Sequence, residues 1–181
     1  MQHWSVGGAV IESSVLPADA LADRAPASAA DPGVLMVKNL RRGGLLDWTP
    51  PGGVIDRGES LISGLTREVL EETGLSVRSW SGPLYEITAH APELGWELRV
   101  EVHRAVEVVG QLQVGRDPDG IVVEADVVDP LDCAERMRSA HPWVREPLVA
   151  WMAERWSGSR SYSYRVEGKD PANLHIVRLD P

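Results

Sequence analysis

The sequence predicts an α/β fold in one domain, with a mixed sheet covered by helices. Three observations predict it. The chain has 181 residues, a length typical of one domain with a single core. Strand-like alternation and short apolar runs occur on both sides of one helical pattern at residues 61–73. Two further helical patterns follow late in the chain, and we find no internal repeat.

The first half contains two predicted strands, at residues 3–13 and 34–40. The two glycines in the first strand indicate a bulge or a close approach of another backbone. Residues 15–33 are rich in Ala, Pro and Asp and show no clear period, so we expect a flexible insertion loop there. Residues 41–53 are dense in Gly and Pro and are expected to be irregular.

The second half predicts more sheet and then helices. Strand-like segments occupy residues 76–91, 96–109 and 121–128, with turn signals between them. Residues 130–140 and 142–156 are predicted helices, each beginning with a proline. We assign residues 1–157 to the main domain. Residues 158–181 are a C-terminal extension that packs on it, with a predicted strand in its sequence.

Composition limits the kinds of partner that we expect the protein to bind. The formal net charge is −9 and the pI is about 5.0, which argues against a protein that binds nucleic-acid polymers through their phosphates. A small phosphorylated ligand needs only a few local cations and stays open. The single cysteine, Cys133, cannot form an internal disulfide. We see neither a secretory signal nor an apolar segment long enough to cross a bilayer, so we expect a cytoplasmic protein without a membrane partner.

The helix at residues 61–73 carries an unusual charge pattern. Ser60 is its expected N-cap and Gly74 its expected end, and Ile62, Leu65, Val69 and Leu70 share its apolar side. Glu68, Glu71 and Glu72 crowd the other side at the negative end of the helix dipole. Each like-charge pair should cost the isolated helix about 0.2–0.5 kcal/mol. A solvated acidic face is the plain alternative, but a sequence that breaks local rules in this way indicates a functional site.

The missing partner is most simply a hard divalent cation. Mg²⁺ prefers carboxylate oxygens and shares its shell with substrate phosphates. Such ions neutralise a polyphosphate and activate water for attack on phosphorus.

The surrounding residues carry a family resemblance. The spacing runs Gly53, five residues, Glu59, seven residues, and then Arg67-Glu68-Val69-Leu70-Glu71-Glu72-Thr73-Gly74-Leu75. All nine specified positions match the Nudix box, so the chain resembles the Nudix hydrolases of the MutT-like kind. The resemblance implies a Nudix-like α/β/α sandwich. It also implies Mg²⁺- or Mn²⁺-dependent hydrolysis of a nucleoside diphosphate linked to another group X.

The resemblance also implies roles for the matching residues. Glu68, Glu71 and Glu72 would bind metal, with Glu72 as the central ligand, and the Gly53 carbonyl would join them. Arg67 would form an ion pair that holds the loop against the helix, close to Glu59. A plain surface pair between Arg67 and Glu71 is the alternative.

A general base must orient or deprotonate the attacking water. In the family it is a box glutamate or a glutamate in a later loop, and Glu124 is the candidate for the later position. An outward-facing strand residue is the alternative reading of Glu124, with Glu93, Glu97 and Glu101 as weaker substitutes.

Basic and aromatic residues supply the candidates for substrate binding. Lys38, Arg41 and Arg42 are the candidates for phosphate contacts, with surface charge as the alternative for both arginines. Tyr85 and Trp96 could stack on a nucleobase. Trp48 is expected in the core, and the tryptophans of the last helix in packing or in a homodimer contact. His90, His103 and His141 form no metal-ligand spacing, and we expect ordinary surface or core roles for them.

Three functions are compared. The first is an active pyrophosphohydrolase for a small nucleotide-type substrate. The second is a nucleotide-sensing module without turnover, which commonly lacks box glutamates that this chain retains. The third is isomerisation of isopentenyl diphosphate, which requires a catalytic cysteine elsewhere than at Cys133. The residues around the box mildly favour a nucleoside triphosphate or an ADP-ribose-like substrate.

Overall fold

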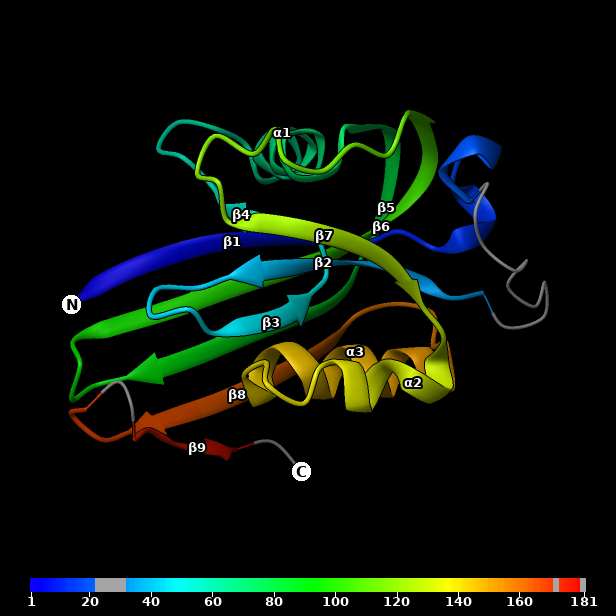
Figure 1. The fold of residues 1–181 in the computed structure, drawn as a ribbon. Helices are drawn as coiled ribbons and strands as arrows, with labels where there is room; N and C mark the ends of the chain where they lie inside the picture. The colour runs from blue at the N-terminus through cyan, green and yellow to red at the C-terminus, as the bar shows by residue number, and fades with distance from the viewer. Residues whose placement is uncertain (22–31, 171–172, 180–181) are drawn as a thin grey trace.

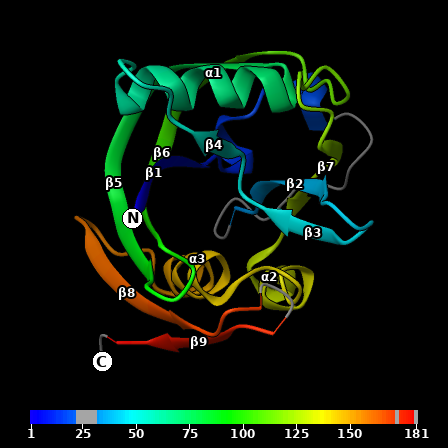
Figure 2. The same cartoon turned by 90° about the vertical axis from the view of Figure 1, so that its left-hand side faces the viewer.

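Two β-sheets lie between α1 on one side and α2 and α3 on the other (Figures 1 and 2). The computed structural model describes residues 1–21, 32–170 and 173–179. The elements run in the order β1 (Gln2–Val10), η1 (Ser13–Val15), η2 (Ala18–Leu21), β2 (Val34–Leu40), β3 (Leu46–Thr49), β4 (Gly52–Val54), α1 (Leu61–Thr73), β5 (Leu75–Ala91), β6 (Trp96–Gly110), β7 (Val122–Val128), α2 (Pro130–Arg136), α3 (Pro142–Glu154), β8 (Arg160–Glu167) and β9 (His175–Arg178).

The larger sheet is mixed, as predicted. Its six strands follow the order β4-β1-β6-β5-β8-β9. β1 is parallel to β6 and antiparallel to β4, and β8 is parallel to β5. The second sheet, β3-β2-β7, is antiparallel. The chain thus has the α/β/α sandwich of the Nudix fold.

α1 lies directly on β1. Ser60 caps the helix by accepting a hydrogen bond from the Ser63 amide at 3.2 Å, and Gly74 ends it in the left-handed conformation with φ of 73°. Both predicted ends are confirmed. A Cβ on Gly7 would lie only 3.1 Å from the Leu65 Cβ, which confirms that the glycines of β1 allow a close approach.

The predicted apolar face of α1 is partly wrong. Leu65 and Val69 are fully buried, but Ile62 and Leu70 are 38% and 49% exposed. Gly64 and Thr73 complete the buried face instead. Because the helix packs closely against β1, the covered arc is narrow and centres on Leu65 and Val69.

The segment expected to be irregular, residues 41–53, contains two short strands. β3 pairs with β2 through a turn in which Gly43 and Gly44 have φ of 84° and 82°. β4 pairs with β1, so that Gly53 lies opposite Gly7. The pairing of β4 with β1 places Gly53, the first residue of the acidic box, on an edge strand of the large sheet.

Two further expectations concern less regular parts of the chain. Of the expected insertion loop at residues 15–33, residues 22–31 lie outside the described residues, and the part before them contains η2. The predicted strand after residue 158 is confirmed, because β8 and β9 of the expected C-terminal extension complete one edge of the large sheet. No helix in the described ranges is long and apolar enough to span a membrane.

The core has two parts. One lies between the large sheet and α2 and α3, and the other lies under α1. Cys133 belongs to the first part and is fully buried, and burial raises the pKa of its thiol to about 11. A thiol held protonated at neutral pH is a poor nucleophile, which argues against the cysteine-dependent isomerase.

Candidate active site

The acidic side of α1 faces the glycine backbone of β4. The Gly52 amide donates a hydrogen bond of 2.8 Å to Oε2 of Glu72. A Cβ on Gly53 would lie 2.4 Å from Oε2 of Glu68, so only glycine leaves room for this carboxylate. The fold therefore brings two glutamates of the box against the glycine backbone at its start.

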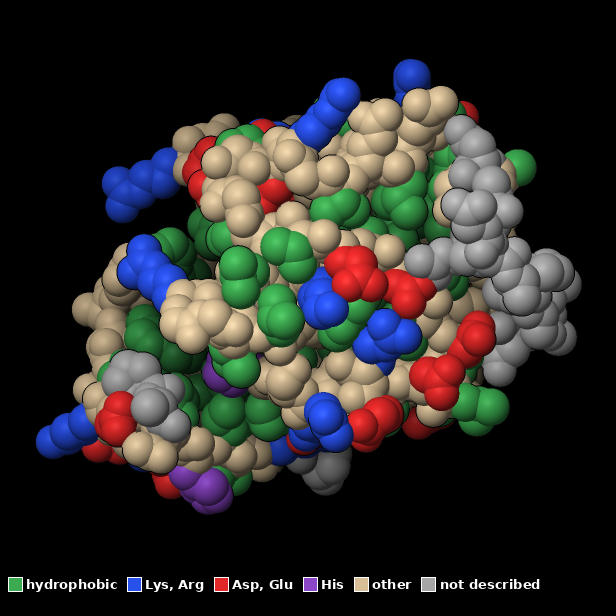
Figure 3. Space-filling model, viewed as in Figure 1, with side chains coloured by type: hydrophobic (Ala, Val, Ile, Leu, Met, Phe, Trp, Pro, Cys, Tyr) green, Lys and Arg blue, Asp and Glu red, His purple; other side chains and the backbone are tan. Residues whose placement is uncertain are grey.

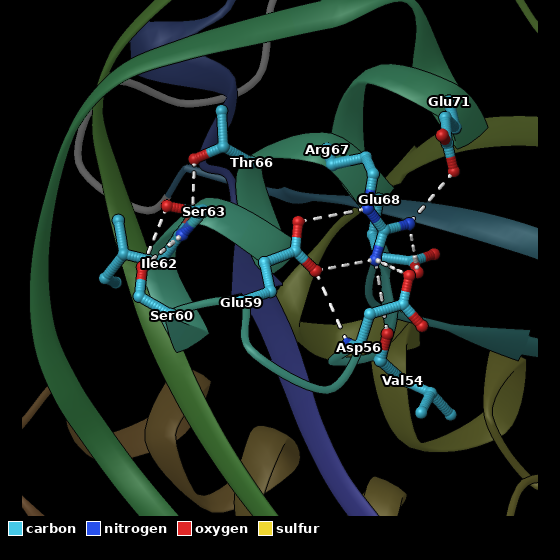
Figure 4. Close-up of polar contacts among 10 residues, drawn as sticks. All are labelled: Val54, Asp56, Glu59, Ser60, Ile62, Ser63, Thr66, Arg67, Glu68 and Glu71. Atoms are coloured by element: carbon cyan, nitrogen blue, oxygen red, sulfur yellow. Dashed lines mark hydrogen bonds and ion pairs between the residues drawn. The ribbon is translucent and has the colours of Figure 1, made fainter.

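Arg67 ties the loop before α1 to the helix (Figure 4). Its Nε and Nη2 donate to the two carboxylate oxygens of Glu59 at 3.2 and 3.1 Å. Its Nη1 donates to Glu68 at 2.8 Å and to Glu71 at 3.2 Å. The guanidinium thus donates hydrogen bonds to three carboxylates and lies 3.8 Å from a fourth, that of Asp56, which is more than the surface pair with Glu71 that was the alternative reading.

The surroundings shift the pKa values of these groups in different directions. Burial is the main cause that raises the pKa of Glu72 to about 8, and the negative charge of Glu68 raises it further. Burial also raises the pKa of Glu68, against the opposing effect of Arg67. The hydrogen bond from Arg67 lowers the pKa of Glu59, and the same contact raises the pKa of Arg67. Glu72 and Glu68 are therefore the two carboxyl groups of the box in which burial outweighs the contacts that favour the charged form.

The donor set fits a hard divalent cation. Glu68, Glu71 and Glu72 lie on one side of the helix, with Glu68 beside Gly53 and Glu72 bonded to the Gly52 amide, and oxygen donors are what Mg²⁺ and Mn²⁺ prefer. Within the described ranges no group of three or more acidic, His or Cys side chains is already gathered for a metal ion. The contacts of Arg67 account for this, since they hold Glu68 and Glu71 in ion pairs.

A cavity of about 720 Å³ opens beside Gly52 and Gly53. Strands β1, β5 and β6 give it an apolar wall, and its other walls come from the β2–β3 hairpin and the start of α3. Figure 3 shows a hollow on this face, with hydrophobic side chains and a histidine side chain inside it. A volume of this size suits a small organic ligand.

Asp117 is an acidic residue that sequence reasoning missed. It lies in the loop between β6 and β7, and its negative charge raises the pKa of both Glu68 and Glu72. Its carboxylate accepts backbone hydrogen bonds from Asp119, Ile121 and Val122 at 2.9–3.2 Å. The signal is the segment Asp-Pro-Asp-Gly at residues 117–120, between two of the predicted strands.

Glu124, the candidate base, lies on β7 opposite Lys38 of β2. Lys38 Nζ donates to Oε2 of Glu124 at 3.0 Å, and it also lies 5.6 Å from the centre of the Trp48 ring. Neither Lys38 nor Glu124 lines the cavity. The structure therefore pairs these two candidates with each other, and their roles in catalysis and substrate binding stay predictions.

The remaining substrate candidates separate into two groups. Arg41 and Arg42 both line the cavity. Tyr85 reaches its wall, but the ring is only 1% exposed and packs edge-on against Trp156 and Tyr162. Trp96 is outside the lining and packs edge-on against Trp143. Both rings serve packing in this structure, and a substrate contact by either one stays a prediction.

Solved structures share this fold. A mutator MutT protein from Bacillus halodurans aligns with a TM-score of 0.61 at 17% identity, over 96% of this chain and 97% of that chain. The E. coli ORF135 protein aligns with a TM-score of 0.63 at 17% identity, over 87% of this chain and 96% of that one. A NUDIX hydrolase from Nitrosomonas europaea gives 0.59 at 23% identity, over 84% and 90%.

The sequence itself decides the family. No curated protein matches the chain in sequence. The family profile described as the NUDIX domain matches residues 23–152, which is most of the chain and includes the whole acidic box. The protein therefore belongs to the Nudix family and is a hydrolase of phosphoric anhydrides.

Proposed function

We propose that the protein is a metal-dependent pyrophosphohydrolase that cleaves a nucleoside diphosphate linked to another group X by attack of water on phosphorus. The observation that carries the proposal is the position of Glu68 and Glu72. They are half-buried acids beside the backbone of Gly52 and Gly53, at the edge of a cavity large enough for a nucleotide. Acids with raised pKa values in a cleft are typical of a functional site.

Glu68, Glu71 and Glu72 would hold Mg²⁺ or Mn²⁺, together with the carbonyl of Gly53. When bound, the ion neutralises the phosphate chain and lowers the pKa of a coordinated water. Arg67 positions this set, because it fixes Glu59 of the preceding loop against the helix.

A carboxylate outside the box is proposed as the base. Glu124 is the residue that the family resemblance favours, and Asp117 is the competing one. The charge of Asp117 acts on both Glu68 and Glu72, whereas Glu124 is paired with Lys38. These contacts favour Asp117, and its carboxylate is held by three backbone amides.

The test is hydrolysis of a nucleotide panel with Mg²⁺ or Mn²⁺. The panel contains nucleoside triphosphates, ADP-ribose, a dinucleoside polyphosphate and a sugar nucleotide, and the products are separated by chromatography. We expect Glu72→Gln to lower turnover by at least about 100-fold, since even residues behind a metal ligand contribute 10- to 100-fold. Glu167→Gln, at an exposed position on β8, is the matched control.

Two results would count against the proposal. Undiminished turnover in Glu72→Gln would remove the metal role of that residue. Tight nucleotide binding by the wild type, without turnover under either metal, would favour the nucleotide-sensing alternative. A cytoplasmic location and a homodimer also stay predictions, which fractionation and light scattering would check.

A further inference from the structure

His141 and Trp143 form a stacked pair at the start of α3. Their ring centres are 4.2 Å apart and the ring planes differ by 17°. Trp143 is only 6% exposed, and Trp96 packs against it edge-on at 6.2 Å. His141 is exposed. The indole is thus fixed in the core and covers one face of an imidazole whose remaining surface is accessible.

This pair lines the cavity that opens beside Gly52 and Gly53. His141 and Trp143 line it together with Gly52 and Gly53, so one space reaches from the stacked rings to the acidic site. The wall between them is apolar and includes Ile87, Leu98 and Val100. A flat ring that leaves water for this space would gain apolar contact as well as stacking.

Arg41 lines the same cavity as His141 and Gly53. Its Nε donates to both carboxylate oxygens of Asp47, at 3.0 and 3.1 Å, and Asn39 donates to the same carboxylate at 3.1 Å. Asp47 is buried, so this arrangement fixes the guanidinium. The described contacts of Arg41 with Asp47 use Nε and leave its two terminal amino groups for a further anion.

The charge of Arg41 acts on both His141 and Glu72, which agrees with a position near both residues. Partial burial of the ring is the main cause that lowers the pKa of His141; the charge of Asp47 opposes this shift and the positive charge of Arg41 adds to it. Burial is also the main cause that raises the pKa of Glu72, and there the same Arg41 charge opposes the rise. Arg41 therefore acts on both groups, and the imidazole is neutral at pH 7.

We propose that His141, supported by Trp143, stacks on the flat heteroaromatic ring of the substrate, while Arg41 binds the phosphate chain between that ring and Glu72. This inference rests on the proposed function and deepens it by assigning residues of this chain to the nucleobase and to the phosphate chain of the substrate. His141 is then a specificity-determining residue.

The experiment compares a probe with a ring and a probe without one. α,β-Methylene nucleoside diphosphates of adenine, guanine and cytosine resist cleavage, and methylenediphosphonate is their ring-free counterpart. Dissociation constants are measured by calorimetry with Mg²⁺ for wild type, His141→Ala, His141→Phe and Arg41→Gln. His175→Ala, at an exposed histidine on β9, is the matched control.

We expect His141→Ala to weaken the best ring-bearing probe about tenfold, the size of one base–aromatic stack, and to leave methylenediphosphonate unchanged. His141→Phe should retain the affinity of the ring-bearing probe, and Arg41→Gln should weaken both kinds of probe. His175→Ala should change neither. Thermal unfolding of each variant checks the fold, and the Phe variant serves if the Ala variant is unstable.

Equal loss of both probes in His141→Ala, or no loss of either, would overturn the proposal. So would wild-type protein that binds ring-bearing probes no tighter than the ring-free one. Other results distinguish this inference from the proposed function. If binding of the ring-bearing probes depends on His141 but no nucleotide is hydrolysed, the inference is supported and the proposed function is not. If Glu72→Gln loses turnover but His141→Ala leaves KM unchanged, the proposed function is supported and the inference is not.

Discussion

The Gly52 amide donates a hydrogen bond of 2.8 Å to the Glu72 carboxylate, and this contact ties β4 to the last turn of α1. It is a single neutral donor for a largely buried acid. One such bond does not replace the water that a carboxylate loses on burial. The pKa of Glu72 therefore rises to about 8, and Glu72 is held protonated at neutral pH unless a cation is bound.

This pKa predicts how the stability of the metal-free protein depends on pH. Between about 4.5, the ordinary value, and about 8, the folded protein keeps a proton on Glu72 that the unfolded chain has lost. Stability should therefore fall as pH rises through this window, by up to about 1.4 kcal/mol per pH unit. Below the window both states are protonated, and above it the loss is complete.

Urea unfolding in the presence of EDTA, at several pH values from 4.5 to 8.5, measures this dependence. Glu72→Gln keeps an acceptor for the Gly52 amide but cannot ionise, so its profile should be flatter than that of the wild type. Adding Mg²⁺ at pH 8 should restore stability to the wild type, because only the folded state binds the ion at this site. Parallel profiles for the two proteins would contradict the assigned pKa.

Gly53→Ala tests the space beside Glu68. The new Cβ would lie 2.4 Å from Oε2 of Glu68, so the carboxylate must move, while the backbone of residue 53 needs no left-handed conformation. We expect weaker binding of Mn²⁺, by about tenfold or more, with the fold retained. Manganese titration followed by electron paramagnetic resonance gives the affinity.

Gly58→Ala is the control for this substitution. It lies in the same loop, where a Cβ would meet nothing within 4 Å, but its φ of 87° strains an alanine. It should lower stability and leave the metal affinity unchanged. If Gly53→Ala and Gly58→Ala bind Mn²⁺ with the same affinity, the space that Gly53 leaves beside Glu68 is not needed for metal binding.

The acidic helix could be predicted well because its signals are local. Ser60, Gly74 and the spacing of the glutamates all act within a few residues, and the structure confirms the helix from Leu61 to Thr73. The strands β3 and β4 were missed because their pairing partners are remote or lie across a Gly-Gly turn. The turn itself was a hairpin signal, hidden by the surrounding glycines and prolines.

The rest of the cavity depends on tertiary packing. Asp47 and His141 line the cavity from two remote segments, and Asp117, from a third, lies close enough to α1 for its charge to act on Glu68 and Glu72. No spacing in the sequence relates them. Tyr85 shows the converse case, since an aromatic near a loop resembles a ligand contact until its ring is seen 1% exposed in the core.

Arg67 is predicted to act as the counterion of the metal-free site. Arg67→Met would leave Glu59, Glu68 and Glu71 without their shared partner, and we expect a loss of about 1–3 kcal/mol, as for hydrogen bonds to charged groups. Bound Mg²⁺ should reduce this loss, because the cation compensates the same carboxylates. Urea unfolding with and without Mg²⁺ measures both values. Arg57→Met, at an exposed position in the same loop, should cost little in either condition.

Replacing Asp117 by Asn and Glu124 by Gln tests which of the two carboxylates is the general base. We expect Asp117→Asn to lower kcat within the 10²- to 10⁴-fold range of a general base. Glu124→Gln should fall well short of that range, because its carboxylate is paired with Lys38 at 3.0 Å. Steady-state kinetics at saturating Mg²⁺ distinguishes loss of the base from loss of metal affinity. The reverse order of effects would return the role to Glu124.

The last prediction concerns stability away from the site. Glu12 is 3% exposed and forms ion pairs with Arg104 and Arg155, which join the end of β1 to β6 and to the end of α3. Arg155 also donates to the Pro32 carbonyl at 2.7 Å. Glu12→Gln leaves the exposed Arg104 and the half-buried Arg155 without their shared anion, so we expect a loss of about 1–3 kcal/mol, as for hydrogen bonds to charged groups.

The same change should leave catalysis intact. Gly7 pairs with Gly53, and Glu12 lies five residues further along the chain, on the order of 15 Å away. Glu167→Gln, which removes an exposed pair with Arg165, should cost less than about 1 kcal/mol. Urea unfolding and kcat are measured on the same preparations. A purely structural cluster changes the free energy of unfolding and leaves kcat unchanged. A fall in kcat without a fall in stability would therefore mean that the Glu12 cluster acts on the active site.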